Sequence, residues 1–289
     1  MHALLGLQLI SALVSASFLF LLAAGVWLVF GVSRFLNLAH GSFFMLSGFL
    51  AYALGETFLD RPGGFWILVG TVPLLAGLAG AGLERVLIRR FYGAPLRVQL
   101  LPMVALIFMI SDLCRYIWGE FPKSVPVLGR FGVISIGGVT FPGYYAVVIG
   151  VSAGVTLILG WIVQRTRWGR LVRAVAQDRE MAATCGVDES RLATQVFAVG
   201  TALAGLAGVL VVPISGASLG MDVSAVIDAF VVVVVGGLGS ILGAAATAVL
   251  VGLTQAFGIL VLPQFAIAFV FALMALVLMV RPKGLFGVD

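Results

Sequence analysis

Charged residues are scarce in this chain. Only 10% of its 289 residues are Asp, Glu, Lys or Arg, whereas soluble domains average about 25%. Hydrophobic residues make up 62%, and they recur in stretches of near 20 residues, which as helices cross about 30 Å of hydrocarbon. These stretches do not alternate as the strands of a membrane β-barrel do. The sequence therefore predicts an all-α fold, a polytopic transmembrane helical bundle.

Residues that carry most active-site chemistry are also few. His2 and His40 are the only histidines, so no His-rich metal cluster can form, and no G-x-S-x-G elbow is present. The two lysines, Lys123 and Lys283, each follow a proline, so there is no Walker A loop to hold phosphates. We expect no catalytic residue, no metal and no cofactor. If ATP drives this protein, another chain binds the ATP.

Eight hydrophobic segments are expected, and the second and seventh look discontinuous. They are Leu4–Phe30, His40–Leu54, Gly64–Ile88, Val98–Trp118, Phe141–Val163, Leu192–Val212, Ala225–Leu260 and Leu262–Val280. The seventh is interrupted by GGLGS (236–240). We expect one membrane domain over residues 1–289. Its longest polar loop covers about 164–190, and its hydrophobic segments lie in the lipid bilayer.

Basic residues gather in three places. Arginines crowd residues 85–97 and 165–191, and Arg281 with Lys283 lies near the C-terminus. The positive-inside rule places all three in the cytoplasm, so the net charge of +5 indicates orientation, with no nucleic-acid partner. An even number of crossings must then separate the second cluster from the C-terminus. Division of Ala225–Leu260 into two crossing or re-entrant pieces satisfies this requirement.

The polar loop TRWGRLVRAVAQDREMAATCGVD (166–188) has a helical pattern. Its apolar residues recur at near-helical spacing, and they are Leu171, Val172, Val175 and Met181. Gly169 can act as a hinge and Gly186 as a helix stop. Such a helix can lie on a membrane surface or enter a groove of a partner. Met181, with alanines and charges of both signs around it, favours a protein partner.

Three separated motifs carry a resemblance. They read LVFGVSRFLNLAHGSFFMLSGFLAY (28–52), GRLVRAVAQDREMAATCGVD (169–188) and VVVVVGGLGSILGAAATAVLVGLTQ (231–255). In this order, and with the ending RPKGLFG (281–287), they are similar to the inner-membrane permeases of branched-chain amino acid ABC importers, the LivH-type family. Two positions depart from the family pattern: Ser42, where an acidic residue is frequent, and Cys185, where methionine is common.

The resemblance implies a multi-pass transport subunit of a bacterial inner membrane, not an enzyme. In such importers an extracytoplasmic solute-binding protein captures the solute, two permease subunits form the path, and separate ABC ATPase subunits drive transport. Whether the permease pairs with itself or with a different chain stays open. The implied solutes are branched-chain amino acids, but permeases for urea, short amides or another small solute share these motifs.

The resemblance also implies two functional regions. A coupling helix from Arg170 to Thr184 would seat in a cleft of the ATPase. Its residues, with the flanking glycines, are Gly169, Arg170, Arg173, Gln177, Asp178, Arg179, Met181 and Gly186. The translocation path would involve Asn37, His40, Gly41, Ser42, Gly236, Gly237 and Gly239. Asn37 and His40 either line the path or cap helices, and GGLGS either supplies flexible backbone or a tight helix contact.

The remaining alternative is a secondary transporter driven by an ion gradient, and acidic residues within the membrane segments test it. Such a protein needs an ionisable site near the membrane midplane. Asp112 and Asp228 are the candidates, and we expect both near the outer face. Asp112 and Arg115 share a helix face and are expected to neutralise each other, while Asp228 has no obvious partner. We therefore expect structural roles for these residues.

Overall fold

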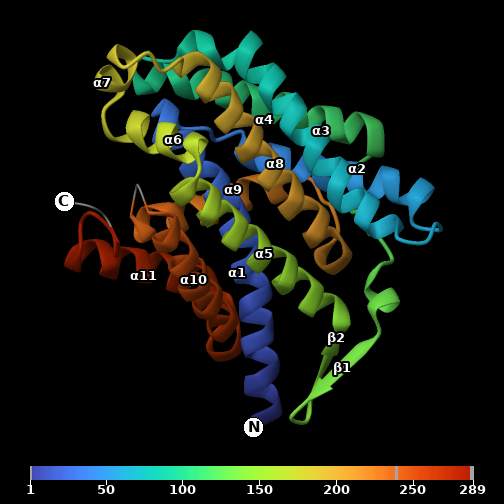
Figure 1. The fold of residues 1–289 in the computed structure, drawn as a ribbon. Coiled ribbons are helices and arrows are strands. Elements are labelled where there is room, and N and C mark those ends of the chain that lie inside the picture. The colour runs from blue at the N-terminus through green and yellow to red at the C-terminus, as the bar shows by residue number, and fades with distance from the viewer. Residues whose placement is uncertain (1, 238–239, 287–289) are drawn as a thin grey trace.

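The computed structural model describes residues 2–237 and 240–286 (Figure 1). Long helices dominate this part of the chain, and the predicted all-α polytopic bundle is confirmed. In chain order the elements are α1 (His2–Ser33), α2 (His40–Phe58), α3 (Gly64–Val86), η1 (Ile88–Phe91), α4 (Leu96–Trp118), η2 (Leu128–Phe131), β1 (Val133–Ile136), β2 (Val139–Pro142), α5 (Gly143–Arg165), α6 (Arg167–Gln177), α7 (Arg179–Thr184), α8 (Glu189–Ser215), α9 (Met221–Gly236), α10 (Ile241–Val261), η3 (Pro263–Phe265) and α11 (Ala266–Val280).

Seven of the described helices are long and apolar enough to cross a membrane, and α2 and α9 are not among them. With 16 residues, α9 is about 24 Å long, which is shorter than the hydrocarbon layer of about 30 Å. The seventh hydrophobic segment thus divides near GGLGS, as expected. Its two pieces run antiparallel, because Gly236 packs on Gly243 while Asp228 contacts Gln255.

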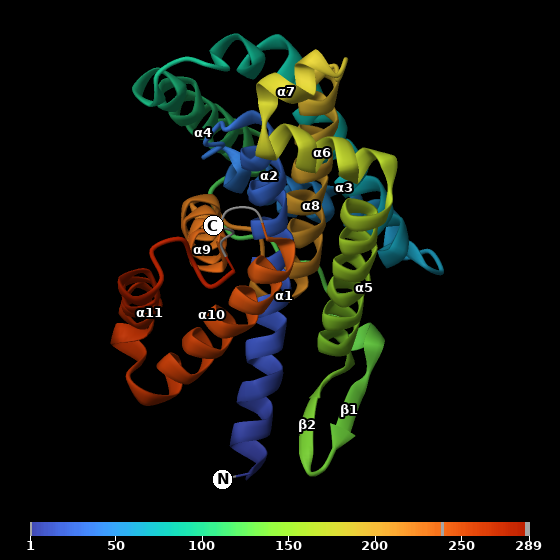
Figure 2. The ribbon, with the colours of Figure 1, turned by 60° about the vertical axis from the view of Figure 1, so that its left-hand side comes forward.

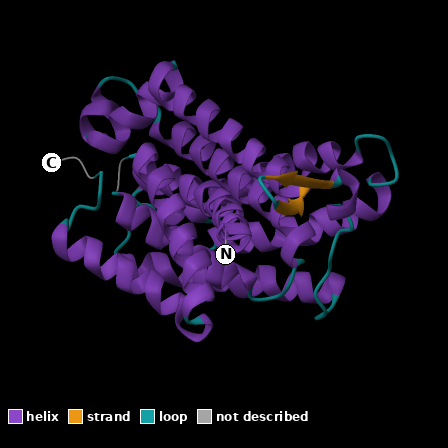
Figure 3. Ribbon diagram, turned by 90° about the horizontal axis from the view of Figure 1, so that it is seen from below, coloured by secondary structure: helices purple, strands orange, loops and turns teal. Residues whose placement is uncertain are grey.

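The centre of the bundle is built around α1 and α8. About three quarters of the most apolar window of each is buried (78% and 72%), against 11–28% for α3, α4, α5 and α11. Viewed from the N-terminal end of α1, the other helices surround it (Figure 3). Glycines let the two central helices approach closely, since a side chain at Gly200 would come within 3.0 Å of the carbonyl oxygen of Gly25.

The two ends of the molecule differ in charge and structure. The arginine-rich residues 85–97 lie at the same end as α6 and α7, whereas the N-terminus and the β1–β2 hairpin lie at the other (Figure 1). The hairpin is antiparallel and pairs Val133 with Pro142. This grouping agrees with the positive-inside prediction, which makes the end with α6 and α7 cytoplasmic.

Cys185 gives a direct test of this orientation. It is free and exposed just after α7, whereas the other cysteine, Cys114, is buried. We expect a membrane-impermeant maleimide to label the protein nearly completely in inside-out vesicles and only at background in right-side-out vesicles. A Cys185→Ser variant, which should label in neither, serves as the control. Equal labelling in right-side-out vesicles would contradict the orientation.

Candidate coupling surface and transport path

The predicted coupling helix is two helices. α6 ends at Gln177 and α7 begins at Arg179, so the expectation of one continuous helix from Arg170 to Thr184 is wrong. Asp178 lies between them in an extended conformation (φ −145°), and its carboxylate accepts a hydrogen bond of 2.9 Å from the backbone N–H of Met181. The break arises because Asp178 caps a new helix instead of continuing the old one.

The glycines that flank the segment have different roles. Gly186 has φ +82° and follows the last turn of α7, as a helix stop requires. Gly169 is not a hinge, because it lies in the first turn of α6, where its N–H donates to the hydroxyl of the cap residue Thr166 at 3.1 Å. A side chain there would come within 2.6 Å of the carbonyl carbon of Val163. Gly169 therefore allows α6 to fold tightly against α5.

Several residues of α6 and α7 attach these two helices to the membrane helices. Val172 and Val175 are buried beneath α6. Arg173 donates to the carbonyl oxygen of Val163, and Arg179 forms an ion pair with Glu189 at the start of α8. Figure 2 shows the result, with α6 and α7 over the ends of α5 and α8. These two arginines are therefore engaged within the chain.

Other residues of the segment remain available to a partner. Leu171 is 41% exposed and Met181 is 61% exposed, and Arg170 and Gln177 are exposed as well. Arg170 and Gln177 are seven residues apart, which places them on one face of α6. We call Arg170, Leu171, Gln177 and Met181 the coupling surface. Exposed Leu and Met side chains rimmed by polar groups are typical of a protein interaction site.

A partly buried ion pair connects the membrane helices at the end of α3. Glu84, in the last turns of α3, is fully buried and accepts hydrogen bonds of 3.1 and 3.0 Å from the guanidinium of Arg89. The hydroxyl of Thr194 in α8 donates to the same carboxylate at 2.7 Å. This hydrogen bonding to Glu84 raises the pKa of Arg89. Sequence reasoning missed this cluster, although an acid inside a hydrophobic segment is a usable signal.

The first predicted break is a non-helical segment, residues 34–39, between α1 and α2, and it ends in a turn at residues 38 and 39. Asn37 is 2% exposed and His40 fully buried, so neither lies on an open surface. The cap residue of α2 is Ala39, and no side chain hydrogen-bonds to the backbone there, so the capping interpretation does not apply to α2. The side-chain amide of Asn37 has no hydrogen-bond partner among the described residues.

The start of α2 meets the start of α9. The hydroxyl of Ser42 donates to the Oδ2 atom of Asp222 at 3.0 Å, and both side chains are buried. Gly41 packs directly on the backbone carbonyl of Asp222. The hydroxyl of Ser42 thus donates a hydrogen bond to a buried carboxylate. An acidic residue at position 42 would instead place a second negative charge beside Asp222. Asp222 is a second residue that the sequence did not single out.

The second predicted break lies at the other end of α9. Gly236 ends this helix, Gly237 has φ +96°, and the predicted residue Gly239 lies outside the described residues. Two helix-end carbonyls, of Val235 and Gly236, accept hydrogen bonds of 2.8 and 3.2 Å from the backbone N–H groups of Leu285 and Phe286. The predicted path residues that the structure describes therefore form two groups, separated by the length of α9, about 24 Å.

Asp112 lacks its expected partner, and Asp228 differs from expectation in both partner and place. Arg115 pairs with Glu120 at 3.3 Å, so the expected neutralisation of Asp112 by Arg115 does not occur. Asp228 has a partner, since the side-chain N–H of Gln255 donates to its Oδ2 atom at 3.1 Å. Asp228 also shares a groove with residues 15–22 of α1. It thus lies beside the middle of the 32-residue helix α1, not near its outer end.

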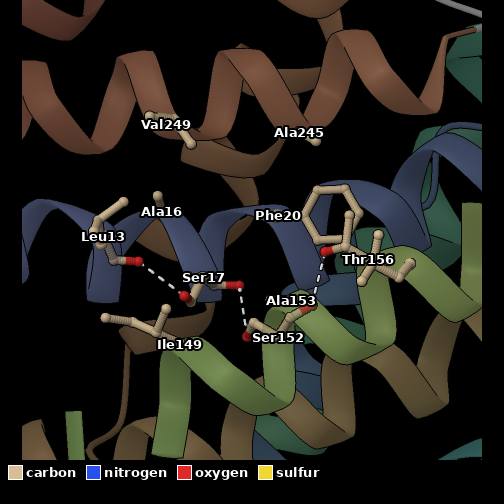
Figure 4. Close-up of a pocket in the computed structure, with 11 residues that line it drawn as sticks. Leu13, Ala16, Ser17, Phe20, Ile149, Ser152, Ala153, Thr156, Ala245 and Val249 are labelled. Atoms are coloured by element: carbon tan, nitrogen blue, oxygen red, sulfur yellow. Dashed lines mark hydrogen bonds between the residues drawn. The ribbon is translucent and has the colours of Figure 1, made fainter. Parts of the chain in front are cut away.

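Two grooves on the helix bundle have contrasting chemistry. One, of about 310 Å³, lies between α1, α5 and α10 (Figure 4). Its hydroxyls donate to backbone carbonyls: Ser17 to Leu13 at 2.8 Å, and Thr156 to Ser152 at 2.7 Å. The other, of about 240 Å³, contains Asp228 and Gln255. Only the second therefore carries an ionisable group.

Comparison with known proteins gives a consistent result. Residues 8–280 match the profile of the family described as the permease component of the branched-chain amino acid transport system. The high-affinity branched-chain amino acid transport system permease protein BraD of Pseudomonas aeruginosa is 31% identical, over 97% of this chain and 95% of its own length. LivH of Escherichia coli is 28% identical, over 92% of this chain and 90% of its own length.

A solved structure shows the same fold. PsaBC from Streptococcus pneumoniae, in complex with Fab, matches with a TM-score of 0.52 and 14% identity, over 96% of this chain and 92% of the solved chain. At this identity the likeness concerns the arrangement of helices alone.

Proposed function

The chain belongs to the family of branched-chain amino acid transport permeases, and we propose that it forms the path of an ABC importer for branched-chain amino acids in the bacterial inner membrane. Separate ATPase subunits hydrolyse the ATP, a second permease subunit completes the path, and an extracytoplasmic solute-binding protein delivers the solute. The observation that carries this proposal is the coupling surface, in which exposed Leu171 and Met181 stand on helices anchored across the cytoplasmic end of the bundle.

The anchoring supports transmission of movement. α6 is held to α8 by the indole N–H of Trp168, which donates to the side chain of Gln195 at 3.1 Å, and α7 by the Arg179–Glu189 ion pair. A partner that pulls on α6 and α7 therefore moves the start of α8. Coupling between two sites requires such an element with alternative positions.

The buried polar residues at the start of α2 support a role beside the path. An unpaired buried amide costs about 1–3 kcal/mol, and the amide of Asn37 has no partner within residues 2–237 and 240–286. We propose that Asn37, His40, Gly41 and Ser42 change their surroundings during the transport cycle, when the amide can meet water or solute. Gly236, Gly237 and Gly239 would supply adaptable backbone at the far end of α9.

A paired substitution in the coupling surface tests the proposed ATPase contact. Leu171→Asp with Met181→Asp should lower co-purification of the ATPase and solute uptake about 30-fold, as expected for loss of about 2 kcal/mol at an interface hot spot. Because both side chains are exposed, the amount of protein in the membrane should not change. Binding and uptake are measured in vesicles that contain the purified subunits.

The control is the pair Leu171→Met with Met181→Leu, which keeps apolar volume and should retain most activity. Arg173 and Arg179 are poor test sites, because both hold contacts within the chain. Undiminished ATPase binding by the Asp variant would remove the coupling role from this surface. Uptake of urea or acetamide in preference to leucine, isoleucine and valine would instead replace the proposed solute.

A further inference from the structure

The groove that contains Asp228 opens on the surface of the bundle between α1, α2, α8, α9 and α10. Its walls are mostly apolar, with Leu19, Leu22 and Phe44 among them. Asp228 is partly exposed within it, in the middle of α9 and about 10 Å from either end of that helix. A carboxylate is therefore placed at depth in a membrane helix and at an open surface.

Contact between lipid hydrocarbon and such a surface is unfavourable. Ionisable side chains within membrane segments nearly always face protein or a water-filled cavity, because hydrocarbon does not solvate the charge. The groove between α1, α5 and α10 differs, since no charged side chain lines it (Figure 4). That groove suits acyl chains. The groove with Asp228 suits a surface that contacts water and polar solute.

The partners of Asp228 leave it free to bind a cation. Gln255 donates one hydrogen bond to Oδ2, and no other hydrogen bond to this carboxylate occurs among the described residues. A carboxylate can accept about four hydrogen bonds, so most of its capacity is unused. The hydroxyls of Ser215 and Ser224 line the same groove, and beside them the aliphatic and aromatic walls can contact a hydrocarbon side chain.

This combination matches the α-ammonium group and the hydrocarbon side chain of a branched-chain amino acid. We propose that the groove is part of the wall of the solute path, and that Asp228, oriented by Gln255, binds the α-ammonium group of the passing amino acid. The inference rests on the proposed function and names the group that recognises the solute. Conduction requires binding that is favourable but easily reversed, and the partial exposure of Asp228 keeps its interaction with an ammonium group weak.

Neutralisation of the carboxylate tests the inference in the assembled transporter. Asp228→Asn keeps the shape and can still accept from Gln255, but it should lower the maximal rate of leucine uptake about tenfold, while Asp228→Glu should restore part of it. The matched control is Asp112→Asn in α4. Asp112 is exposed, lies outside the groove and forms no hydrogen bond or ion pair among the described residues, so its neutralisation should leave uptake unchanged.

A second measurement is independent of uptake. Ser224 is exposed and lies four residues before Asp228, on the same face of α9. In a protein with Cys114→Ala and Cys185→Ser, a Ser224→Cys thiol should react about tenfold faster with cationic aminoethyl methanethiosulfonate than with the anionic sulfonatoethyl reagent. Asp228→Asn should reduce this preference to that of a small free thiol, because a thiolate by itself favours the cationic reagent. A purely structural role of Asp228 would not produce the excess over a free thiol.

The outcomes separate the inference from the proposed function. If the wild-type transporter imports leucine but Asp228→Asn imports it equally well, or the Ser224→Cys thiol reacts with neither reagent, the inference is wrong and the function stands. If the wild-type transporter with its partners imports no branched-chain amino acid, the proposed function is wrong. A charge preference at Ser224→Cys that Asp228→Asn reduces to that of a small free thiol would still identify the groove as a water-filled, cation-attracting path.

Discussion

Replacement of Arg89 by methionine is expected to destabilise the protein by about 3–5 kcal/mol, towards the lower end because the Arg89 side chain is 36% exposed. The substitution leaves the carboxylate of Glu84, which is fully buried, without its counter-ion, although the hydroxyl of Thr194 still donates to it. A buried charge without its counter-ion has lost the attraction that offset its desolvation. Thermal unfolding of the purified protein in detergent measures the loss.

Removal of both charges should restore much of this stability. In Glu84→Met with Arg89→Met no buried charge remains in this cluster, and replacement of a whole ion pair by apolar residues is often close to neutral. The double variant should therefore unfold at a higher temperature than Arg89→Met alone. The single-site control is Arg90→Met in the same loop, since Arg90 is exposed and has no ion pair in the part of the chain that the structure describes. Equal loss in Arg89→Met and Arg90→Met would contradict the importance of the pair.

This pair has a consequence for coupling as well as for stability. Arg89 also donates to the carbonyl oxygen of Ser190 at 3.3 Å, one residue after Glu189, which holds Arg179 of α7. The cluster thus joins α3 and η1 to the start of α8 at the point where α7 is attached. In the stabilised double variant we expect ATP hydrolysis to continue while uptake per ATP falls, because η1 is no longer tied to the start of α8.

The sequence predicts where most membrane helices begin and end, because the thickness of the membrane sets the length of an apolar run. The second segment starts at His40, the fourth ends at Trp118 and the last ends at Val280, as expected. The division at GGLGS was also foreseeable, because glycine weakens a helix. The break at Asp178 was missed, although Asp followed by Glu180 in a first helical turn is a recognisable helix start.

Contacts between distant segments could not be read from one sequence. Ser42 and Asp222 are 180 residues apart, and Asp228 and Gln255 are 27 apart. Each pair forms only because the packing of α2, α9 and α10 brings two polar groups together inside apolar surroundings. Spacing along the chain suggested that Arg115 would pair with Asp112, but a carboxylate beyond the end of α4, that of Glu120, pairs with it instead.

Substitution of Gly41 by alanine is expected to have a large steric effect at the contact between α2 and α9. A side-chain carbon at this position would overlap the carbonyl oxygen of Asp222 and come within 2.9 Å of its carbonyl carbon. Both are backbone atoms and cannot rotate away, so α2 and α9 must separate. Overpacking in a tight core costs about 1–3 kcal/mol and occasionally more, and the hydrogen bond from Ser42 to Asp222 would be lost in addition.

Gly70→Ala is the matched control for this prediction. Gly70 lies inside α3 and has no atom within 4 Å of an added side-chain carbon, so alanine there should be neutral or stabilise the helix by about 0.5–1 kcal/mol. Ser42→Ala removes the hydrogen bond without overlap and should fall between the two. If the α2–α9 contact forms a wall of the path, Gly41→Ala should lower leucine uptake per folded molecule at least tenfold. Wild-type melting temperature and uptake in Gly41→Ala would show that α2 and α9 are not in contact in the working transporter, and that the path is built from other helices.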